Sequence, residues 1–115
     1  MQYMLLIYAD PAAEPMPGTP EFDRMMEGYA ALTNRLRADG AMRSGDGLQG
    51  PETATTLRVR GGKVETMDGP FAETKEHLGG YYIIDVPDLD AALRYAAMIP
   101  SATYGSVEVR PVMIY

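Results

Sequence analysis

The residues best suited to chemistry lie close together between positions 68 and 81. Asp68 and Gly69 open this stretch with a turn signal, and several ionisable side chains follow within a few positions. Acidic and basic groups beside a glycine-rich strand can transfer protons to and from a small substrate, because the glycines let a ligand come close. The candidate catalytic residues are therefore Asp68, Glu73, Lys75 and His77.

A structural interpretation of the same stretch is a turn followed by a solvated charged loop. Pro70 fixes one backbone angle after the turn residues, and Phe71 can pin the turn to the core. His77 is the single histidine of the chain, and a lone histidine is often a surface or capping residue. Both interpretations stay open at the level of sequence.

A further polar candidate is Asp85, at the end of an apolar strand. If Asp85 shares a face with Tyr81 and Ile83, its carboxylate needs a partner, because an unpaired buried charge is strongly unfavourable. Arg110, on a strand expected to lie alongside, can supply that partner. The pair is then a structural ion pair, with Glu108 as another polar group on the same strand as Arg110.

Residues 45–50 read Gly-Asp-Gly-Leu-Gln-Gly and match the spacing of the dinucleotide-binding fingerprint. That fingerprint needs a helix to begin at the glycines, whereas Pro51 and a threonine-rich strand follow here. The absence of cysteine and the single histidine also exclude a Cys-ligated or His-rich metal centre within one chain. We therefore expect neither a cofactor nor a metal.

The composition is that of one globular domain. The chain has 115 residues, of which 46% are hydrophobic, and its formal net charge is −6. An acidic balance argues against direct binding to nucleic acid or to an anionic membrane, since both need clustered basic residues. No apolar run reaches the length of a signal sequence or a membrane span, so we expect a cytoplasmic protein.

The apolar spacing predicts two helices and six strands. Thr19 and Asp88 are the expected N-caps, Gly40 ends the first helix, and Gly61-Gly62 is a two-residue hairpin turn. The second helix carries an apolar stripe of Leu89, Ala92, Leu93 and Ala96. Strands are expected at residues 2–8, 41–44, 54–60, 63–67, 79–86 and 106–115, and helices at about 20–39 and from 88 to just before Pro100.

This order of elements predicts an α+β protein with a ferredoxin-like fold. Without the hairpin at residues 54–67, the pattern is βαββαβ, in which two helices cover one face of an antiparallel sheet. The strands at residues 3–8 and 81–86 are apolar on both faces, so the second face needs a cover as well. A second copy of the chain is the simplest cover, and we expect a homodimer with sheet packed on sheet.

The segment Asp68-Gly69-Pro70-Phe71, followed by Ala-Glu-Thr-Lys-Glu and then Gly-Gly-Tyr-Tyr, resembles the DGPF signature of the YCII-related family of small bacterial proteins. The resemblance extends over nearly the whole chain and includes residues 4–8, 54–60, 85–92 and 107–111. It implies a ferredoxin-like fold and a dimeric α+β barrel, in agreement with the strand pattern.

The resemblance implies less about function. Most family members have no assigned activity, some are encoded beside extracytoplasmic-function sigma factors, and the related muconolactone isomerases and chloromuconolactone dehalogenases act on small lactones. Relatives proposed to be enzymes pair an aspartate with a histidine on the first helix. Here that stretch reads Met26-Glu27-Gly28-Tyr29, so the histidine–aspartate pair is not carried over.

Two functions of different class follow from these observations. The first is a small dimeric protein that binds a modest organic metabolite, or transforms it by lyase- or isomerase-like acid–base chemistry. The alternative is a non-catalytic accessory or ligand-sensing protein that works with an extracytoplasmic-function sigma factor. A DGPF segment that lines a concave pocket favours the first, and one that lies flat on the surface favours the second.

Overall fold

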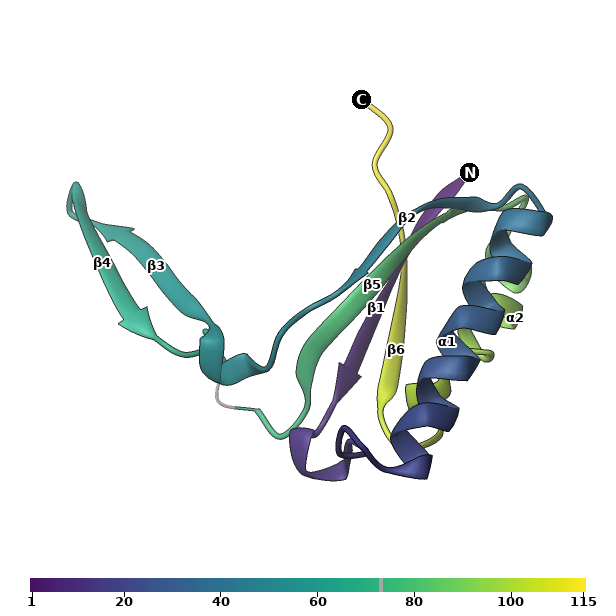
Figure 1. The fold of residues 1–115 in the computed structure, drawn as a ribbon. Coiled ribbons are helices and arrows are strands. Elements are labelled where there is room, and N and C mark those ends of the chain that lie inside the picture. The colour runs from purple at the N-terminus through teal and green to yellow at the C-terminus, as the bar shows by residue number, and fades with distance from the viewer. Residues whose placement is uncertain (73) are drawn as a thin grey trace.

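The computed structural model describes residues 1–72 and 74–115 and has the predicted α+β, ferredoxin-like arrangement. Four antiparallel strands form a sheet in the order β2-β5-β1-β6, and both helices lie on one of its faces (Figure 1). The inserted hairpin, β3–β4, forms a separate two-stranded sheet. The bounds are β1 Gln2–Ala9, α1 Pro20–Ala38, β2 Met42–Gly47, β3 Thr55–Arg60, β4 Lys63–Asp68, β5 His77–Asp85, α2 Leu89–Ala96 and β6 Ser106–Pro111, with short 3₁₀ turns η1 Pro11–Ala13, η2 Pro51–Thr53 and η3 Pro100–Thr103.

Strand β1 holds the sheet together, because it pairs antiparallel with both β5 and β6. Leu5 lies opposite Tyr82 on one side and Val109 on the other, and all three point toward the helices. Side chains alternate between the two faces of a strand, so Tyr3 and Ile7 are buried on this face as well. The core therefore lies between β1, β5 and the two helices.

The two central strands, β1 and β5, are apolar on the opposite face of the sheet too, as the sequence predicts. Met4 lies opposite Ile83, and Leu6 lies opposite Tyr81, on the face that the helices do not cover. Tyr8 follows on the same face, and all five side chains are half-buried within the single chain. We call this surface, formed by Met4, Leu6, Tyr8, Tyr81 and Ile83, the open sheet face.

The two helices begin where the sequence places them. The Thr19 hydroxyl accepts a hydrogen bond from the backbone N–H of Phe22 at 3.2 Å, and the Asp88 carboxylate accepts one from Ala91 at 2.9 Å. Gly40 follows α1 with a φ of 69°, which favours glycine. In the part of the chain that the structure describes, neither helix is long and apolar enough to cross a membrane.

The predicted apolar stripe of α2 is wrong in part. Leu89 and Leu93 are 48% and 47% exposed, whereas Ala91, Ala92 and Ala96 are buried against the sheet. Alanine side chains are short, so they allow this helix to lie close to the strands beneath it, and the larger leucines stay at the surface. Close packing of the backbone, rather than the size of the apolar side chain, selects the buried face.

The glycine run at residues 45–50 forms more strand than predicted. Gly45 and Gly47 lie within β2 and pair with Tyr82 and Gly80 of β5. A Cβ atom on Gly45 would lie 2.9 Å from the Tyr82 ring and 3.0 Å from the carbonyl oxygen of Tyr81, so this position has no room for a side chain. The turn η2 follows, not an α-helix, which confirms that the dinucleotide-binding context is missing.

The last strand is shorter than the expected 106–115, because β6 ends at Pro111. Proline has no N–H to donate to a strand ladder. One further backbone hydrogen bond joins Val112 to Gln2 at 2.9 Å, and Met113, Ile114 and Tyr115 are exposed.

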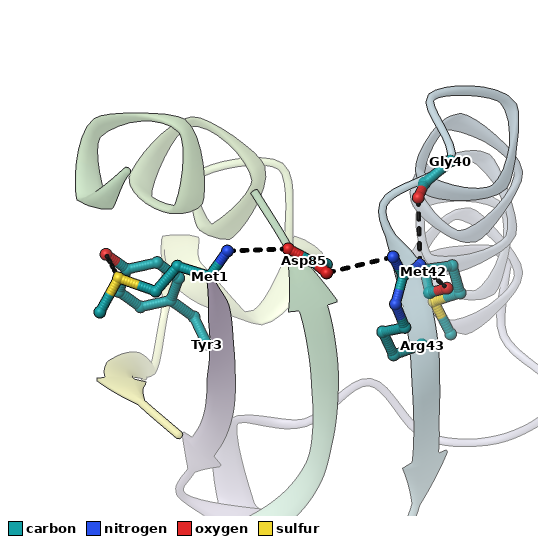
Figure 2. A network of polar contacts seen from close by, with 6 residues as sticks. All are labelled: Met1, Tyr3, Gly40, Met42, Arg43 and Asp85. Atoms are coloured by element: carbon teal, nitrogen blue, oxygen red, sulfur yellow. Dashed lines mark hydrogen bonds and ion pairs between the residues drawn. The ribbon is translucent and has the colours of Figure 1, made fainter. Parts of the chain in front are cut away.

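Asp85 joins the ends of three strands in a polar network (Figure 2). Its carboxylate accepts a hydrogen bond from the Met1 amino group at 2.9 Å and another from the Arg43 guanidinium at 3.2 Å. The predicted partner was wrong: β1 lies between β5 and β6, so Arg110 is out of reach and pairs instead with Glu108 of its own strand. The pKa of Asp85 is lowered by the hydrogen bond from the Met1 amino group and by the charge of Arg43.

This network predicts a pH-dependent effect of Asp85→Asn. The pKa of the carboxyl is lower in the folded chain than the roughly 3.9 of an unfolded one, so its contribution to stability is present above that pH and is lost as the pH falls through the folded-state value. The substitution should lower Tm by a few degrees at most at pH 7, on the order of one exposed ion pair. Thermal melts of the parent and the variant should converge at about pH 2, and a Tm difference that stays constant from pH 7 to pH 2 would contradict this account.

Candidate functional site

A cavity of about 820 Å³ lies between α1 and the face of the sheet that the helices cover. One wall is α1, the opposite wall is β2 and β5, and the loop that contains η1 closes one end. Most of the lining near α1 is apolar and includes Ile7, Phe22, Met25, Met26 and Met42. Cavities of this size and character commonly hold small organic molecules.

A chain of hydroxyl groups joins two polar residues of this cavity wall, Glu14 and Tyr29. The Tyr29 hydroxyl lies 2.5 Å from the Ser101 hydroxyl, and Ser101 accepts a hydrogen bond from Tyr104 at 3.3 Å. The Tyr104 hydroxyl also lies 3.0 Å from Oε2 of the Glu14 carboxylate. Ser101 itself is only 2% exposed, so its hydroxyl is satisfied entirely within the protein.

The two tyrosines that take part in these hydrogen bonds, Tyr29 and Tyr104, keep their protons more firmly than free tyrosine does. Burial raises the pKa of Tyr29, and burial likewise raises the pKa of Tyr104, with a further contribution from the neighbouring Glu14 carboxylate. Both phenols are therefore neutral hydrogen-bond donors at neutral pH. A carboxylate that faces neutral phenols can bind a polar group of a ligand and exchange a proton with it.

The β2 side of the cavity carries a second set of polar groups. Thr33 of α1 bonds to the Tyr82 hydroxyl at 3.0 Å, which bridges the helix and the sheet. On the open face of the sheet, by contrast, Tyr81 donates to the Asp46 carboxylate at 3.1 Å, and this hydrogen bond raises the pKa of Tyr81. Arg37 adds a positive charge to the lining.

The structure separates the residues that the sequence grouped as candidates. His77 is half-buried at the start of β5, opposite Ala9, and lines the cavity. Asp68 ends β4 on the projecting hairpin and is exposed, and Lys75 is exposed in the connection to β5. Glu73 lies outside the described residues. His77 is thus the candidate that the fold brings to the cavity.

The DGPF turn is fixed mainly by its backbone. Gly69 has a φ of 99°, its N–H donates to the carbonyl of Ala54 at 2.7 Å, and its carbonyl accepts from the Thr56 hydroxyl at 2.7 Å. The expectation that Phe71 pins the turn to the core was wrong, because its side chain is 66% exposed. Its ring instead packs against the Arg58 guanidinium, 4.7 Å from the ring centroid.

Sequence reasoning missed the polar chain because its members lie far apart along the sequence. Glu14 and Tyr104 are 90 positions apart, and Tyr29 and Ser101 are 72 apart. One signal was present: Tyr29 falls on the apolar stripe of α1, and a buried tyrosine hydroxyl usually has a partner. Nothing in the sequence identified which residue that partner would be.

Metal binding has no geometric support in the part of the chain that the structure covers. Among residues 1–72 and 74–115, no three histidine or carboxylate side chains converge as a metal site requires.

Comparison with known proteins identifies the family of this chain. The family model described as the YCII-related domain matches residues 1–114. The chain belongs to the YCII-related family. An uncharacterized protein of Rhizobium meliloti (strain 1021) is 38% identical over 117 residues, an alignment that covers 100% of this chain and 94% of the relative. The resemblance noted in the sequence is therefore confirmed at the level of the family.

The geometry of the turn predicts that Asp68→Asn is nearly neutral. The hydrogen bonds that fix the turn belong to Gly69 and Thr56, and asparagine keeps the turn-forming character of aspartate. We expect a Tm within about one degree of the parent, as for other neutral surface changes. Gly69→Ala is the matched comparison and should lower Tm clearly, because its φ of 99° strains any side chain. A large loss of stability in Asp68→Asn would show that the carboxylate holds the turn.

Proposed function

We propose that this YCII-related protein binds a small organic molecule in the cavity between α1 and the sheet. The observation that carries the proposal is the lining itself, in which an apolar wall surrounds a few polar groups, among them Glu14, Tyr29 and His77. An apolar wall favours a mainly hydrocarbon or ring-shaped ligand, while the polar groups favour one oxygen-bearing head group. A small carboxylic acid or lactone fits this description.

The same groups support acid–base chemistry of the lyase or isomerase type. A carboxylate such as Glu14 can accept a proton from carbon next to a carbonyl, and Tyr29 can donate a hydrogen bond to the oxygen that gains charge. His77 also lines the cavity and adds an imidazole to its polar groups. Asp68, Glu73 and Lys75 belong to this proposal only as groups on the segment that leads to His77.

A ligand-sensing role beside a sigma factor would use the same cavity, and the exposed position of Asp68 and Phe71, outside the lining of that cavity, supports this role. The two functions differ in the fate of the bound molecule, which is converted in one case and released unchanged in the other. Incubation of the protein with a bound lactone, followed by chromatography of the small molecules, separates them. A cytoplasmic location is part of both proposals.

The binding proposal predicts the behaviour of Tyr29→Phe. Thermal-shift screening of small lactones and carboxylic acids should find a compound that raises Tm by several degrees, since a ligand at 100 times its Kd contributes about 2.7 kcal/mol. The substitution keeps the ring but removes the hydroxyl, so the ligand-induced shift should fall by more than half. The stability of the variant without ligand should drop by about 0.5–1.5 kcal/mol, the cost of one hydrogen bond.

Tyr95→Phe is the control for that measurement. The Tyr95 hydroxyl donates to Asp39 at 2.5 Å on the surface of α2, away from the residues that line the cavity. This control variant should therefore keep the full ligand-induced shift. If Tyr29→Phe and Tyr95→Phe respond alike to the compound, it binds somewhere other than the cavity beside α1.

We further propose that the protein is a homodimer that packs sheet on sheet. Support comes from the open sheet face, whose five large side chains lie side by side on the two central strands. Covering such a surface removes a contiguous apolar patch from water, and a two-fold axis lets each chain cover the other.

Sedimentation equilibrium at micromolar concentration tests the dimer. The parent chain should sediment as a dimer, and Ile83→Asp should dissociate and destabilise it, because the substitution buries a charge without a partner. Leu89→Asp is the control, since Leu89 is 48% exposed at the start of α2, where an acidic side chain is well tolerated. A parent chain that is monomeric throughout would refute the proposal.

A further inference from the structure

The hairpin β3–β4 stands away from the rest of the chain, and we call residues Thr55–Asp68 the arm. Figure 1 shows it projecting from one end of the sheet, on the side opposite the helices. The molecule is correspondingly broad and flat, with extents of 48 × 43 × 18 Å and a radius of gyration of 15.9 Å. A compact chain of this length would have a radius of gyration of about 13 Å. The arm is thus held out into solvent rather than folded onto its own body.

One face of the arm is apolar and exposed. Residues directly opposite each other share a face, so Val59 and Val64 lie together, and Leu57 lies on the same side. The exposed fraction of the side chain is 58% for Leu57, 54% for Val59 and 64% for Val64. A lone two-stranded hairpin is at best marginally stable in water, and an exposed apolar strand surface invites a partner. The arm therefore has the character of a contact surface.

The charge of the arm indicates the chemistry of the surface that covers it. The arm carries three basic and two acidic residues, for a net charge of +1, whereas the whole chain has −6, which leaves −7 on the body. Arg60 lies directly opposite Lys63 beside the turn, and like charges in this position repel. No ion pair with either side chain is formed among the described residues. An acidic surface that meets the tip of the arm would relieve this repulsion.

The body of a second copy has the required properties. It is acidic, and it carries an apolar surface of its own, the open sheet face, that a partner must cover. Under two-fold symmetry, each arm reaches the other chain, so both projecting arms are covered in one closed assembly. A heterologous partner would leave the open sheet face to be covered separately.

We infer that the arm is a dimer clasp: its apolar face, formed by Leu57, Val59 and Val64, packs on the body of a second copy of this chain, and its basic tip lies against acidic side chains of that body. The inference rests on the proposed homodimer and adds a second contact to its sheet-to-sheet interface. It also links assembly to the cavity, because Pro51 and Glu52, which line the cavity, come just before the arm. A partner that holds the arm thereby helps to fix this part of the cavity wall.

Val64→Asp tests the clasp by sedimentation equilibrium. Within one chain Val64 is 64% exposed, so an aspartate there should leave Tm of the monomer nearly unchanged. If a second copy covers the site, the dimer dissociation constant should rise by roughly a hundredfold, as for a charge placed in an apolar contact. Leu89→Asp, the same change at a similarly exposed leucine on the helix layer, should leave the dimer constant unaltered.

A second variant separates loss of contact from loss of the hairpin. Aspartate is unfavourable in strands, whereas threonine keeps the β-branched shape of valine and is well accepted there. Val64→Thr should therefore preserve the arm and still weaken the dimer, by on the order of three- to tenfold, through loss of apolar contact. A dimer constant equal to that of the parent in both variants overturns the inference.

Cross-linking locates the contact directly. Because the chain has no cysteine of its own, an introduced cysteine is the single site that a maleimide labels. Val64→Cys, labelled with a benzophenone maleimide, is mixed with an excess of isotopically heavy parent chain and irradiated. The inference requires covalent dimers that join a light arm peptide to a heavy body peptide. Products confined to one chain, or arm-to-arm products alone, would contradict it.

The outcomes distinguish this inference from the homodimer on which it rests. If Ile83→Asp dissociates the chain while the Val64 variants and the cross-linking show no effect, the dimer stands and the clasp is wrong. If the parent chain is monomeric, both fail.

Discussion

The antiparallel pairing of β1 with β5 and β6 fixes which side chains face the helices and which face away from them. It places Tyr3, Leu5 and Ile7 on one face and Met4 and Leu6 on the other, because side chains alternate along a strand. Two helices cover one face of a four-stranded sheet and leave the other open. The buried core and the open sheet face are therefore two consequences of the same register.

The cavity follows from how unevenly the helices cover that sheet. The small residues of α2 are buried against the strands, whereas bulky side chains of α1 such as Phe22, Met25 and Tyr29 line the space beside β2 and β5. The space so formed is apolar near the helix and polar where the segment around η1 supplies Glu14. A mixed lining of this kind gives a ligand both a hydrophobic surface and an orienting hydrogen bond.

The hairpin inserted between β2 and β5 disturbs the fold little, since its ends leave the sheet through the short turn η2 and the DGPF turn. Gly69 gives the second turn its left-handed backbone, and Thr56 closes it with a hydrogen bond. The geometry of the hairpin's base thus accounts for the glycine of the motif. Of the described residues that the sequence grouped as candidates, His77 lines the cavity, whereas Asp68 and Lys75 are exposed and are not part of its lining.

The sequence alone determined the order of elements, both helix caps, the Gly61–Gly62 turn and the family, because these depend on local backbone preferences and on motifs read in order. The tertiary structure determined which residues come into contact. Asp85 pairs with Met1 and Arg43 rather than Arg110, since the central strand separates β5 from β6. The contact between Glu14 and Tyr104 joins residues 90 positions apart, and no local pattern encodes a meeting at that distance. Periodicity indicates which residues avoid water, but only the packed chain decides which polar groups they enclose.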